Sequence, residues 1–455
     1  MERMTIQEIA EAIGSTERFE GAVEQVSTDS RALPEGCLFL ALAGERFNGH
    51  DYLAAALQNG AAFAVAQERR ADYAAQNGRI LYVQDTGRAL LELGRAYREK
   101  FSIHCVGVTG SVGKTTTKEM IAQVVSAGYK TLKTEGNLNN EIGLPKTLFG
   151  LDRSHQAAVI EMGMEGLGEI ATLAAVAQPQ IGVITNVGVS HIERLGSREN
   201  ILKAKMELAD ALPDGAPLLL CGDNDLLSGV QMPRLRVTFF GIENPGCAVL
   251  AEEIFEQAGE TWFTLQHPDG RIPVHLPCMG RHNVLNALAA FAVGRELGIS
   301  PEDCAQALAG YRPSGMRQKV VDWNGVTVVE DCYNASPDSM RAALSTLGRW
   351  EGASRRIAVL ADMLELGEIS RMSHIEAGQC AAEQGIDLLL AYGEQGRYYV
   401  EGAFGVDARW FETKDALCKA LEQESIPGSV IWVKASRGMK LEEVLEQFYS
   451  RTSNP

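Results

Sequence analysis

The spacing of apolar positions along the chain predicts an α/β protein. Short apolar runs rich in β-branched residues, typical of buried strands, alternate with segments whose apolar residues recur every three or four positions, typical of amphipathic helices. In the first hundred residues we expect strands at 37–42, 61–66 and 80–84, and helices at 51–58 and 89–100. This alternation within a short stretch predicts a small α/β domain.

The alternation continues to the end of the chain. In the middle we expect strands at 103–108, 157–160 and 181–187, helices at 198–211 and 284–294, and hairpin strands between 213 and 277. In the last third, helices alternate with four strands at 326–331, 357–362, 387–393 and 430–436. This is a Rossmann-like doubly wound pattern. It lacks a GxGxxG turn after its first strand, which disfavours a dinucleotide.

The length of 455 residues indicates several domains, because one core rarely serves more than about 250–300 residues. Prolines and glycines at 300–316 mark a boundary near residue 313. We predict a small N-terminal α/β domain at 1–100, a central domain with a mostly parallel sheet at 101–313, and a C-terminal Rossmann-like domain at 314–455.

Composition and charge narrow the class of protein. With 45% hydrophobic and 22% charged residues, the chain is ordinary for a globular protein. Its net charge of −17 argues against binding nucleic acid or inserting into an anionic membrane. No signal peptide or apolar run of about 18 residues occurs. The nine cysteines are scattered without a Cys-x-x-Cys pair, so we expect reduced thiols, neither disulfides nor zinc, and a cytoplasmic location.

A strand, a glycine-rich turn and a helix follow one another at 101–123. Glycines let backbone amides approach a phosphate, and the helix N-terminus adds partial positive charge. Lys114 would lie against the terminal phosphates, with the Thr115 hydroxyl on the accompanying magnesium ion. The usual loop has a glycine five positions before Gly113, where this chain has Val108, so the loop is shortened. A solvated lysine-bearing turn is the alternative, but the flanking strand and helix favour a nucleoside triphosphate site.

Polar side chains follow two later strands of the central part. Glu161 comes directly after the strand at 157–160, at the edge where open α/β sheets place ligands and where an acid often holds magnesium. An acidic turn residue is the alternative. His191 follows the strand at 181–187, and a lone histidine in a loop is more often incidental than a ligand.

Lys205 occupies an unusual position on the predicted helix at 198–211. It falls on the apolar stripe, between Ile201 and Leu208. A buried lysine must be paired or lose its charge. The alternative is that its ammonium extends along the helix to water.

Several loops contain more polar groups than a turn requires. They are 27–31, 44–51, the asparagine-bearing 133–145, 331–337 after a C-terminal strand and 434–438 after another. Amides, hydroxyls and charges there suit a ligand, although turn chemistry also selects Asn, Asp, Ser and Gly. Asn283 precedes a predicted helix and would act as its N-cap.

Seven motifs in this order resemble the Mur ligase family, the ATP-dependent amino-acid and peptide ligases of peptidoglycan synthesis. They are TGSVGKTTTKEM, EGNLNNEIGLP, EMGMEGLGEI, TNVGVSHIERLGS, ILKAKMEL, GRHNVLNALAA and EDCYNASPDSM. The resemblance covers essentially the whole chain. It implies a central ATPase domain of the phosphate-loop type and an N-terminal domain that binds the UDP end of a substrate.

The resemblance also implies the site residues. For ATP they are Thr109, Gly110, Ser111, Val112, Gly113, Lys114, Thr115, Thr116, Asn283 at the adenine, Arg317 and Asp331. For two magnesium ions they are Thr115, Glu161, His191 and a Lys205 carbamylated by carbon dioxide. Lys114, Lys205 and His191 would be the catalytic residues. For the substrates they are Ser30, Arg31, Asn137, Asn139, Asn140 and Asn334, with the 434–437 loop near the second substrate.

Within the family, YNASPDSM and EGNLNNEIGLP are most similar to the branch that joins D-alanyl-D-alanine to UDP-N-acetylmuramoyl-tripeptide. The Asp-Asn-Pro-Arg motif of the third-residue ligases is absent. Ser336 and Ala435 depart from the usual asparagine and glycine, and both departures concern the second-substrate site rather than the ATP chemistry. We expect a monomer. The alternatives are a third-residue or folylpolyglutamate-type ligase of the same superfamily, or a nucleotide-switched binding protein. A dinucleotide-dependent oxidoreductase is disfavoured by the missing glycine turn.

Overall fold

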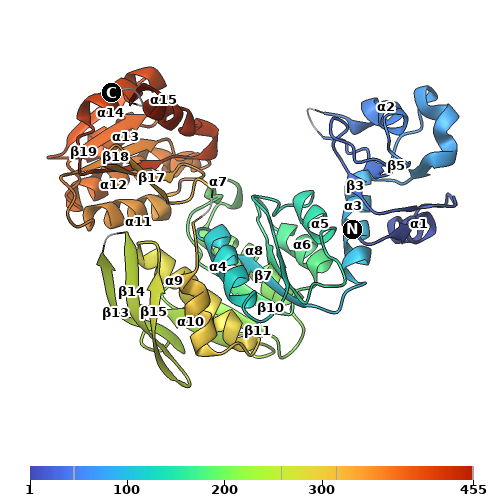
Figure 1. Cartoon of the computed structure of the whole chain (residues 1–455), viewed down its shortest axis with the longest axis horizontal. Helices are drawn as coiled ribbons and strands as arrows, with labels where there is room; N and C mark the ends of the chain where they lie inside the picture. Colours follow the sequence, from blue (N-terminus) through green and yellow to red (C-terminus); the bar gives the residue numbers. More distant parts are fainter. Residues whose placement is uncertain (45–46, 258, 314, 453–455) are drawn as a thin grey trace. The chain divides into compact units, whose positions relative to one another are not determined.

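The computed structural model describes residues 1–44, 47–257, 259–313 and 315–452 (Figure 1). The chain divides into two compact units. The first unit consists of residues 1–109, 128–183 and 204–218, and the second consists of residues 110–127, 184–203 and 219–455. Glu45 and Arg46 of the predicted 44–51 loop, and Ser314 beside the predicted boundary, lie outside the described residues. No helix among the described residues combines the length and apolar character needed to cross a bilayer.

The N-terminal part of the first unit is built on a parallel four-stranded sheet of order β3-β4-β5-β6. Its elements are β1 (Met4–Thr5), α1 (Ile6–Ile13), β2 (Ala22–Val23), β3 (Val26–Ser27), β4 (Leu38–Leu40), η1 (Gly49–Tyr52), α2 (Leu53–Gln58), β5 (Phe63–Ala66), η2 (Ala71–Arg79), β6 (Ile80–Tyr82) and α3 (Thr86–Arg98). The predicted strands and helices are all present. The first helix begins at Ile6 because Thr5 and Glu8 form a capping box there.

Helix α3 fixes this sheet to the rest of the first unit. The Tyr97 hydroxyl donates to the Leu151 carbonyl at 2.6 Å, and Arg98 Nε donates to the Ala177 carbonyl at 3.0 Å. Arg98 is buried, so its charge is compensated by carbonyl oxygens rather than by water.

The largest sheet has nine strands in the order β15-β14-β13-β12-β11-β10-β7-β9-β8. Its strands are β7 (His104–Thr109), β8 (Thr131–Lys133), β9 (Ala157–Glu161), β10 (Ile181–Ile184), β11 (Pro217–Cys221), β12 (Arg236–Gly241), β13 (Val249–Gln257), β14 (Glu260–His267) and β15 (Gly270–Leu276). The β7–β9, β8–β9 and β12–β13 pairs are parallel, whereas β13–β14 and β14–β15 are antiparallel. The helices of this region are α4 (Lys114–Val125), α5 (Gly143–Leu148), α6 (Glu169–Ala177), α7 (Ile192–Leu195), α8 (Arg198–Ala211), α9 (Arg281–Glu296) and α10 (Pro301–Ala309).

The C-terminal part of the second unit is a six-stranded sheet of order β16-β17-β21-β18-β19-β20. Its elements are β16 (Lys319–Trp323), β17 (Val326–Asp331), α11 (Pro337–Gly348), β18 (Arg355–Ala361), η3 (Gly367–Ile369), α12 (Ser370–Glu383), β19 (Leu388–Tyr392), α13 (Arg397–Gly402), β20 (Asp407–Phe411), α14 (Lys414–Glu424), β21 (Ser429–Lys434), η4 (Arg437–Met439) and α15 (Glu442–Thr452). One core packs α11, α12 and α13 on the sheet and another packs α14 and α15, so the doubly wound prediction is confirmed.

Two strands of this sheet were absent from the prediction. The β16 strand pairs antiparallel with β17 through a turn in which Asn324 and Gly325 both have positive φ, at 52° and 77°. An Asn-Gly pair is the usual sequence of such a tight hairpin turn. The β20 strand is at the sheet edge and consists only of exposed and half-buried residues, which makes its apolar pattern weak.

All nine cysteines of the chain are free and buried. Burial raises the pKa of the Cys221, Cys278, Cys304 and Cys332 thiols to about 12. The prediction of reduced cysteines without a disulfide framework agrees with this arrangement.

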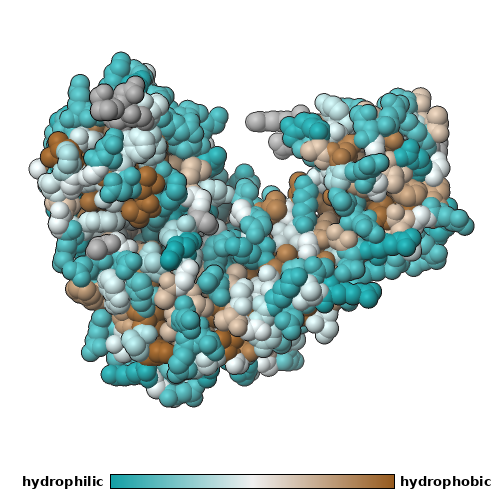
Figure 2. Space-filling view, in the orientation of Figure 1, coloured by the Kyte–Doolittle hydropathy of each residue, from teal (hydrophilic) through white to brown (hydrophobic). Residues whose placement is uncertain are grey.

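The space-filling view shows charged and polar side chains over most of the visible face, with apolar groups scattered among them (Figure 2). On this face the charged residues therefore lie at the surface.

Candidate functional site

The glycine-rich turn is held in a tight conformation between β7 and α4. Gly110 has φ 154° and Gly113, the residue before the helix, has φ 83°. A Cβ at Gly113 would lie 2.8 Å from Asn286 Oδ1, and one at Gly110 would collide with the Thr185 side chain. Both positions therefore require glycine.

The segment after β10 braces this loop. Asn186 Oδ1 accepts hydrogen bonds from the backbone amides of Ser111 (3.0 Å) and Val112 (2.8 Å). The Thr185 hydroxyl donates to the Val112 carbonyl at 2.7 Å, and the Gly188 amide donates to Ser111 Oγ at 2.9 Å. Sequence reasoning missed Asn186 as a site residue because the strand was expected to run to residue 187, whereas β10 ends at Ile184.

A cavity of about 170 Å³ opens beside the loop, within the second unit. Its lining includes these predicted site residues: Ser111, Val112, Gly113, Lys114, Thr115, Thr116, Asn283, Arg317, Asp331 and Asn334. Lys114 Nζ lies over the loop and donates to the Gly110 carbonyl at 2.8 Å. Thr109 does not line the cavity; its hydroxyl donates to the Met162 carbonyl at 2.9 Å within the first unit.

The prediction that Asn283 is a helix N-cap is wrong. Helix α9 begins at Arg281, Gly280 is the residue before it, and Asn283 is therefore inside the helix. Its Nδ2 donates to the Met279 carbonyl and to Gln318 Oε1, both at 2.7 Å. The helix starts one turn early because Gly280, at φ 107°, makes the bend that the asparagine was expected to make.

Gln318 also fixes the state of His282 on the same wall. Its amide nitrogen lies 2.6 Å from His282 Nε2. Because an amide nitrogen only donates, this ring nitrogen accepts and the imidazole is neutral. Burial lowers the pKa of His282; the Asp331 carboxylate partly opposes this shift and the Lys434 ammonium adds to it.

A buried ion pair also lines the cavity. Lys434 Nζ lies 2.7 Å from Asp331 Oδ2, and the side chains are only 4% and 10% exposed. Trp432 Nε1 donates to the same oxygen at 3.3 Å. Arg317 stacks over the Tyr333 ring at 4.2 Å. Lys434 lines the same cavity as the phosphate loop, so this member of the 434–437 loop lies with the nucleotide residues.

The residues predicted for magnesium belong to both units. In the second unit Thr115 lines the cavity, and His191 Nδ1 lies 3.0 Å from Glu365 Oε2. In the first unit Glu161 is the last residue of β9, rather than the first after it, and is buried. The described residues contain no cluster of three or more His, Cys, Asp or Glu side chains suited to a metal ion.

Lys205, in the first unit, is only 1% exposed. The alternative in which its ammonium reaches water is therefore wrong.

The asparagines of the 133–145 loop have different roles. Asn139 Nδ2 donates to Glu161 Oε1 at 2.8 Å and so orients that carboxylate. Asn140 Oδ1 accepts from the amides of Ile142 (3.2 Å) and Gly143 (2.8 Å), which is turn chemistry. Asn137 is exposed.

In the N-terminal 27–31 loop, Arg31 is exposed. Its guanidinium forms a hydrogen-bonded ion pair with Asp29 at 2.8 Å, and the neighbouring Ser30 is half-buried.

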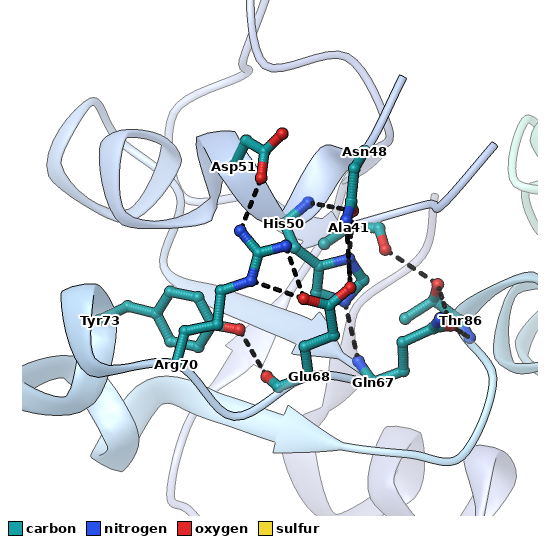
Figure 3. A network of polar contacts seen from close by, with 9 residues as sticks. All are labelled: Ala41, Asn48, His50, Asp51, Gln67, Glu68, Arg70, Tyr73 and Thr86. Carbon is teal, nitrogen blue, oxygen red and sulfur yellow. Dashed lines mark hydrogen bonds and ion pairs between the residues drawn. The ribbon is translucent and has the colours of Figure 1, made fainter. Parts of the chain in front are cut away.

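A polar network orders the other predicted N-terminal loop (Figure 3). His50 is fully buried; its Nε2 accepts from the Gln67 amide at 3.0 Å and its Nδ1 lies 2.7 Å from Asn48 Oδ1. Asn48 Nδ2 in turn donates to Glu68 Oε1 at 3.1 Å, and Glu68 accepts from Arg70. Burial is the main cause of a lowered His50 pKa.

A glycine loop between a parallel strand and a helix, opening on a polar cavity, defines a nucleotide-binding α/β protein of the phosphate-loop class. Comparison with known proteins identifies the family. The Mur ligase middle domain matches residues 108–294, the Mur ligase glutamate ligase domain matches 316–437, and the Mur ligase family catalytic domain matches 22–98. The chain belongs to the Mur ligase family.

Relatives match along nearly the whole chain. The UDP-N-acetylmuramoyl-tripeptide--D-alanyl-D-alanine ligase of Bacillus subtilis is 38% identical over 98% of each chain, and that of Escherichia coli is 36% identical over 93% of each. A crystal structure of MurF from Acinetobacter baumannii superposes with a TM-score of 0.92 at 30% identity, over 99% of each chain. MurF ligase from Thermotoga maritima in complex with ADP has a TM-score of 0.86 at 30% identity, over 94% of this chain and 98% of that one. The three-domain α/β architecture is that of the Mur ligases.

Proposed function

We propose that this chain is an ATP-dependent ligase that joins D-alanyl-D-alanine to UDP-N-acetylmuramoyl-tripeptide. The observation that carries the proposal is the full-length similarity to ligases named for this reaction, at 36–38% identity. The phosphate-loop cavity supports the use of ATP, as does the ADP in the Thermotoga maritima neighbour.

The reaction proceeds in two chemical steps, formation of an acyl phosphate and attack on it by the amine. A carboxylate oxygen of the tripeptide attacks the γ-phosphorus of ATP. The bond between that phosphorus and the oxygen bridging to the β-phosphate breaks, so that ADP departs and an acyl phosphate is formed. The amine of D-alanyl-D-alanine then attacks the acyl carbon, the amine loses a proton, and inorganic phosphate departs as the peptide bond forms. Because the tripeptide carboxylate and the ATP phosphates are both anions, the protein's contribution is positioning and neutralisation of charge.

The cavity residues fit these tasks. Lys114 and the loop amides would hold the phosphates. Asn283, on helix α9, would contact the adenine ring, and Arg317 and Asp331 would close over the nucleotide from the C-terminal part. Asn186 would fix the conformation of the loop by accepting hydrogen bonds from two of its amides.

For magnesium we retain Thr115, Glu161, His191 and Lys205. The buried Glu161 carboxylate and the Thr115 hydroxyl are oxygen donors of the kind this ion prefers. A lysine ammonium is not a ligand, but reaction of the amine with carbon dioxide releases a proton and leaves an anionic carbamate oxygen. Bound magnesium would neutralise the phosphate and carboxylate charges.

For the substrates we retain Ser30, Arg31, Asn137, Asn139, Asn140 and Asn334. Asn139 would act through Glu161, which it orients, and Asn334 lines the nucleotide cavity. We also retain the three domains at 1–100, 101–313 and 314–455, a monomeric state and a cytoplasmic location. Sedimentation equilibrium tests the monomer.

Phosphate release measured with UDP-N-acetylmuramoyl-tripeptide, with and without D-alanyl-D-alanine, tests the proposal. Phosphate should appear at a sustained rate only when both substrates are present, together with the pentapeptide product by mass spectrometry. Turnover only with a different amine, such as a third-residue amino acid or glutamate with a folate, would assign another ligase of the superfamily. Nucleotide binding without turnover would leave a nucleotide-switched binding protein.

A further inference from the structure

A carboxylate outside the nucleotide cavity joins two of the walls that form it. Glu256, near the end of β13, has a side chain only 10% exposed. Its Oε1 accepts from the Gly280 amide at 2.7 Å, and its Oε2 accepts from Arg349 Nε at 3.1 Å. Gly280 immediately precedes helix α9, and Arg349 immediately follows helix α11.

These two helices carry much of the nucleotide wall. Helix α9 contributes His282, Asn283 and Asn286 to the lining, and helix α11 contributes Asp338, Ser339 and Ala342. Where the helices meet, a Cβ on Gly280 would lie 3.1 Å from Thr346 Oγ1. The start of α9 therefore packs directly on α11, and any movement of Gly280 displaces His282 and Asn283.

The start of helix α9 has no side-chain cap of its own, because Gly280 stands at the N-cap position. A carboxylate beside the first turn of a helix is stabilising there because it opposes the partial positive charge of the helix end. Glu256 supplies that charge from a neighbouring strand. Its charge also reaches His282, where it opposes the effect of burial on the imidazole pKa.

We infer that Glu256, bridging Gly280 and Arg349, is a positioning residue for the nucleotide. It sets the spacing and direction of the first turn of α9 against α11, and through them the positions of His282 and Asn283. The inference rests on the proposed use of ATP, and it concerns affinity for the nucleotide rather than the transfer of the phosphoryl group.

Direct binding of Mg-ADP and steady-state ligation by Glu256→Ala test the inference. Because the first turn of α9 would no longer be held in place, Kd for Mg-ADP and KM for ATP should rise about tenfold or more, with kcat within about twofold of the parent. Arg349→Met should show a smaller rise in the same two constants, and Arg349→Lys should recover part of it.

Glu253→Gln is the matched control, because Glu253 is an acid of the same strand that instead accepts from the Thr264 hydroxyl at 2.8 Å. It should leave both constants unchanged. Unaltered Kd and KM in Glu256→Ala would overturn the inference, as would equal changes in Glu253→Gln or a loss confined to kcat and melting temperature. Binding of Mg-ADP is measured independently of ligation, so a parent protein that binds ADP but does not ligate these substrates would refute the proposed reaction alone.

Discussion

At the residue scale, the phosphate loop depends on a side chain that contacts it from behind. Asn186 holds two consecutive loop amides with one oxygen, and no other side-chain acceptor for these amides occurs among the described residues. The loop conformation is therefore determined jointly by its own glycines and by Asn186, which lies just after β10.

Asn186→Ala should weaken nucleotide binding. Two hydrogen bonds of about 1 kcal/mol each to the side-chain oxygen are lost, and the loop would lose contacts that fix its conformation. We expect an increase in Kd for Mg-ADP of about tenfold, measured by calorimetry, with little change in melting temperature. Asn200→Ala, which removes an amide that donates to the Leu195 carbonyl, is the control. An unchanged Kd in Asn186→Ala would contradict the bracing role.

His50 gives a pH dependence of stability. Its pKa is lowered in the folded state because it is buried. The unfolded chain therefore binds a proton at His50 more readily than the folded protein does. The stabilisation due to the neutral imidazole is fully present above the unfolded pKa of about 6.5. It is lost as pH falls through the folded pKa. One such group changes the free energy of unfolding by at most about 1.4 kcal/mol per pH unit.

Urea unfolding between pH 7.5 and 5 measures this effect. The parent should lose more stability on acidification than His50→Gln, and the difference between the two curves is the contribution of His50. His282 and the buried His374 also have lowered pKa values and remain in both proteins, so they cancel in the difference. Parallel curves would contradict the prediction.

At the scale of elements, most strands and helices could be predicted because their apolar periodicity is strong. Helix 198–211 has the predicted bounds, and the four central strands of the C-terminal sheet lie where the apolar runs are. The β20 strand was missed because an edge strand is half-exposed and its pattern is diluted. The start of α9 was misplaced because a glycine bend leaves no polar cap residue in the sequence.

The tight turn between β16 and β17 allows a test of whether its backbone conformation requires glycine. Gly325 has φ 77°, which a residue with a Cβ adopts only with strain. Gly325→Ala should lower the free energy of unfolding by about 1 kcal/mol, measured by urea unfolding. Gly229→Ala, at a glycine without a positive φ and with open space around it, should change stability little. Equal effects would indicate that the turn is not strained.

At the scale of the whole molecule, the candidate site could be predicted only in part. The phosphate loop is recognisable from its motif, and the nine predicted nucleotide residues other than Thr109 and Gly110 all line the cavity. The roles of Asn139, Asn186 and Glu256 arise from side chains that meet through folding, which no local pattern reveals.

Lys205→Ala should abolish ligation by the whole protein, and added short carboxylates should partly restore it. The reason is that a carbamate is replaced by a diffusible carboxylate of similar charge. Lys203→Ala, at an exposed position of the same helix, should retain full activity. The measurement is phosphate release with both substrates, with and without acetate or formate. Full activity in Lys205→Ala would refute the carbamate.

Because every native thiol is buried, cysteines introduced at the surface of this chain can be labelled selectively. A maleimide probe should leave the folded parent nearly unmodified and react with all nine cysteines only in denaturant, as intact mass would record. One cysteine introduced at an exposed position in each of two domains would then give a defined pair of dye sites. Energy transfer between those dyes would record whether the distance between the two labelled positions changes during turnover, without first deleting any native cysteine.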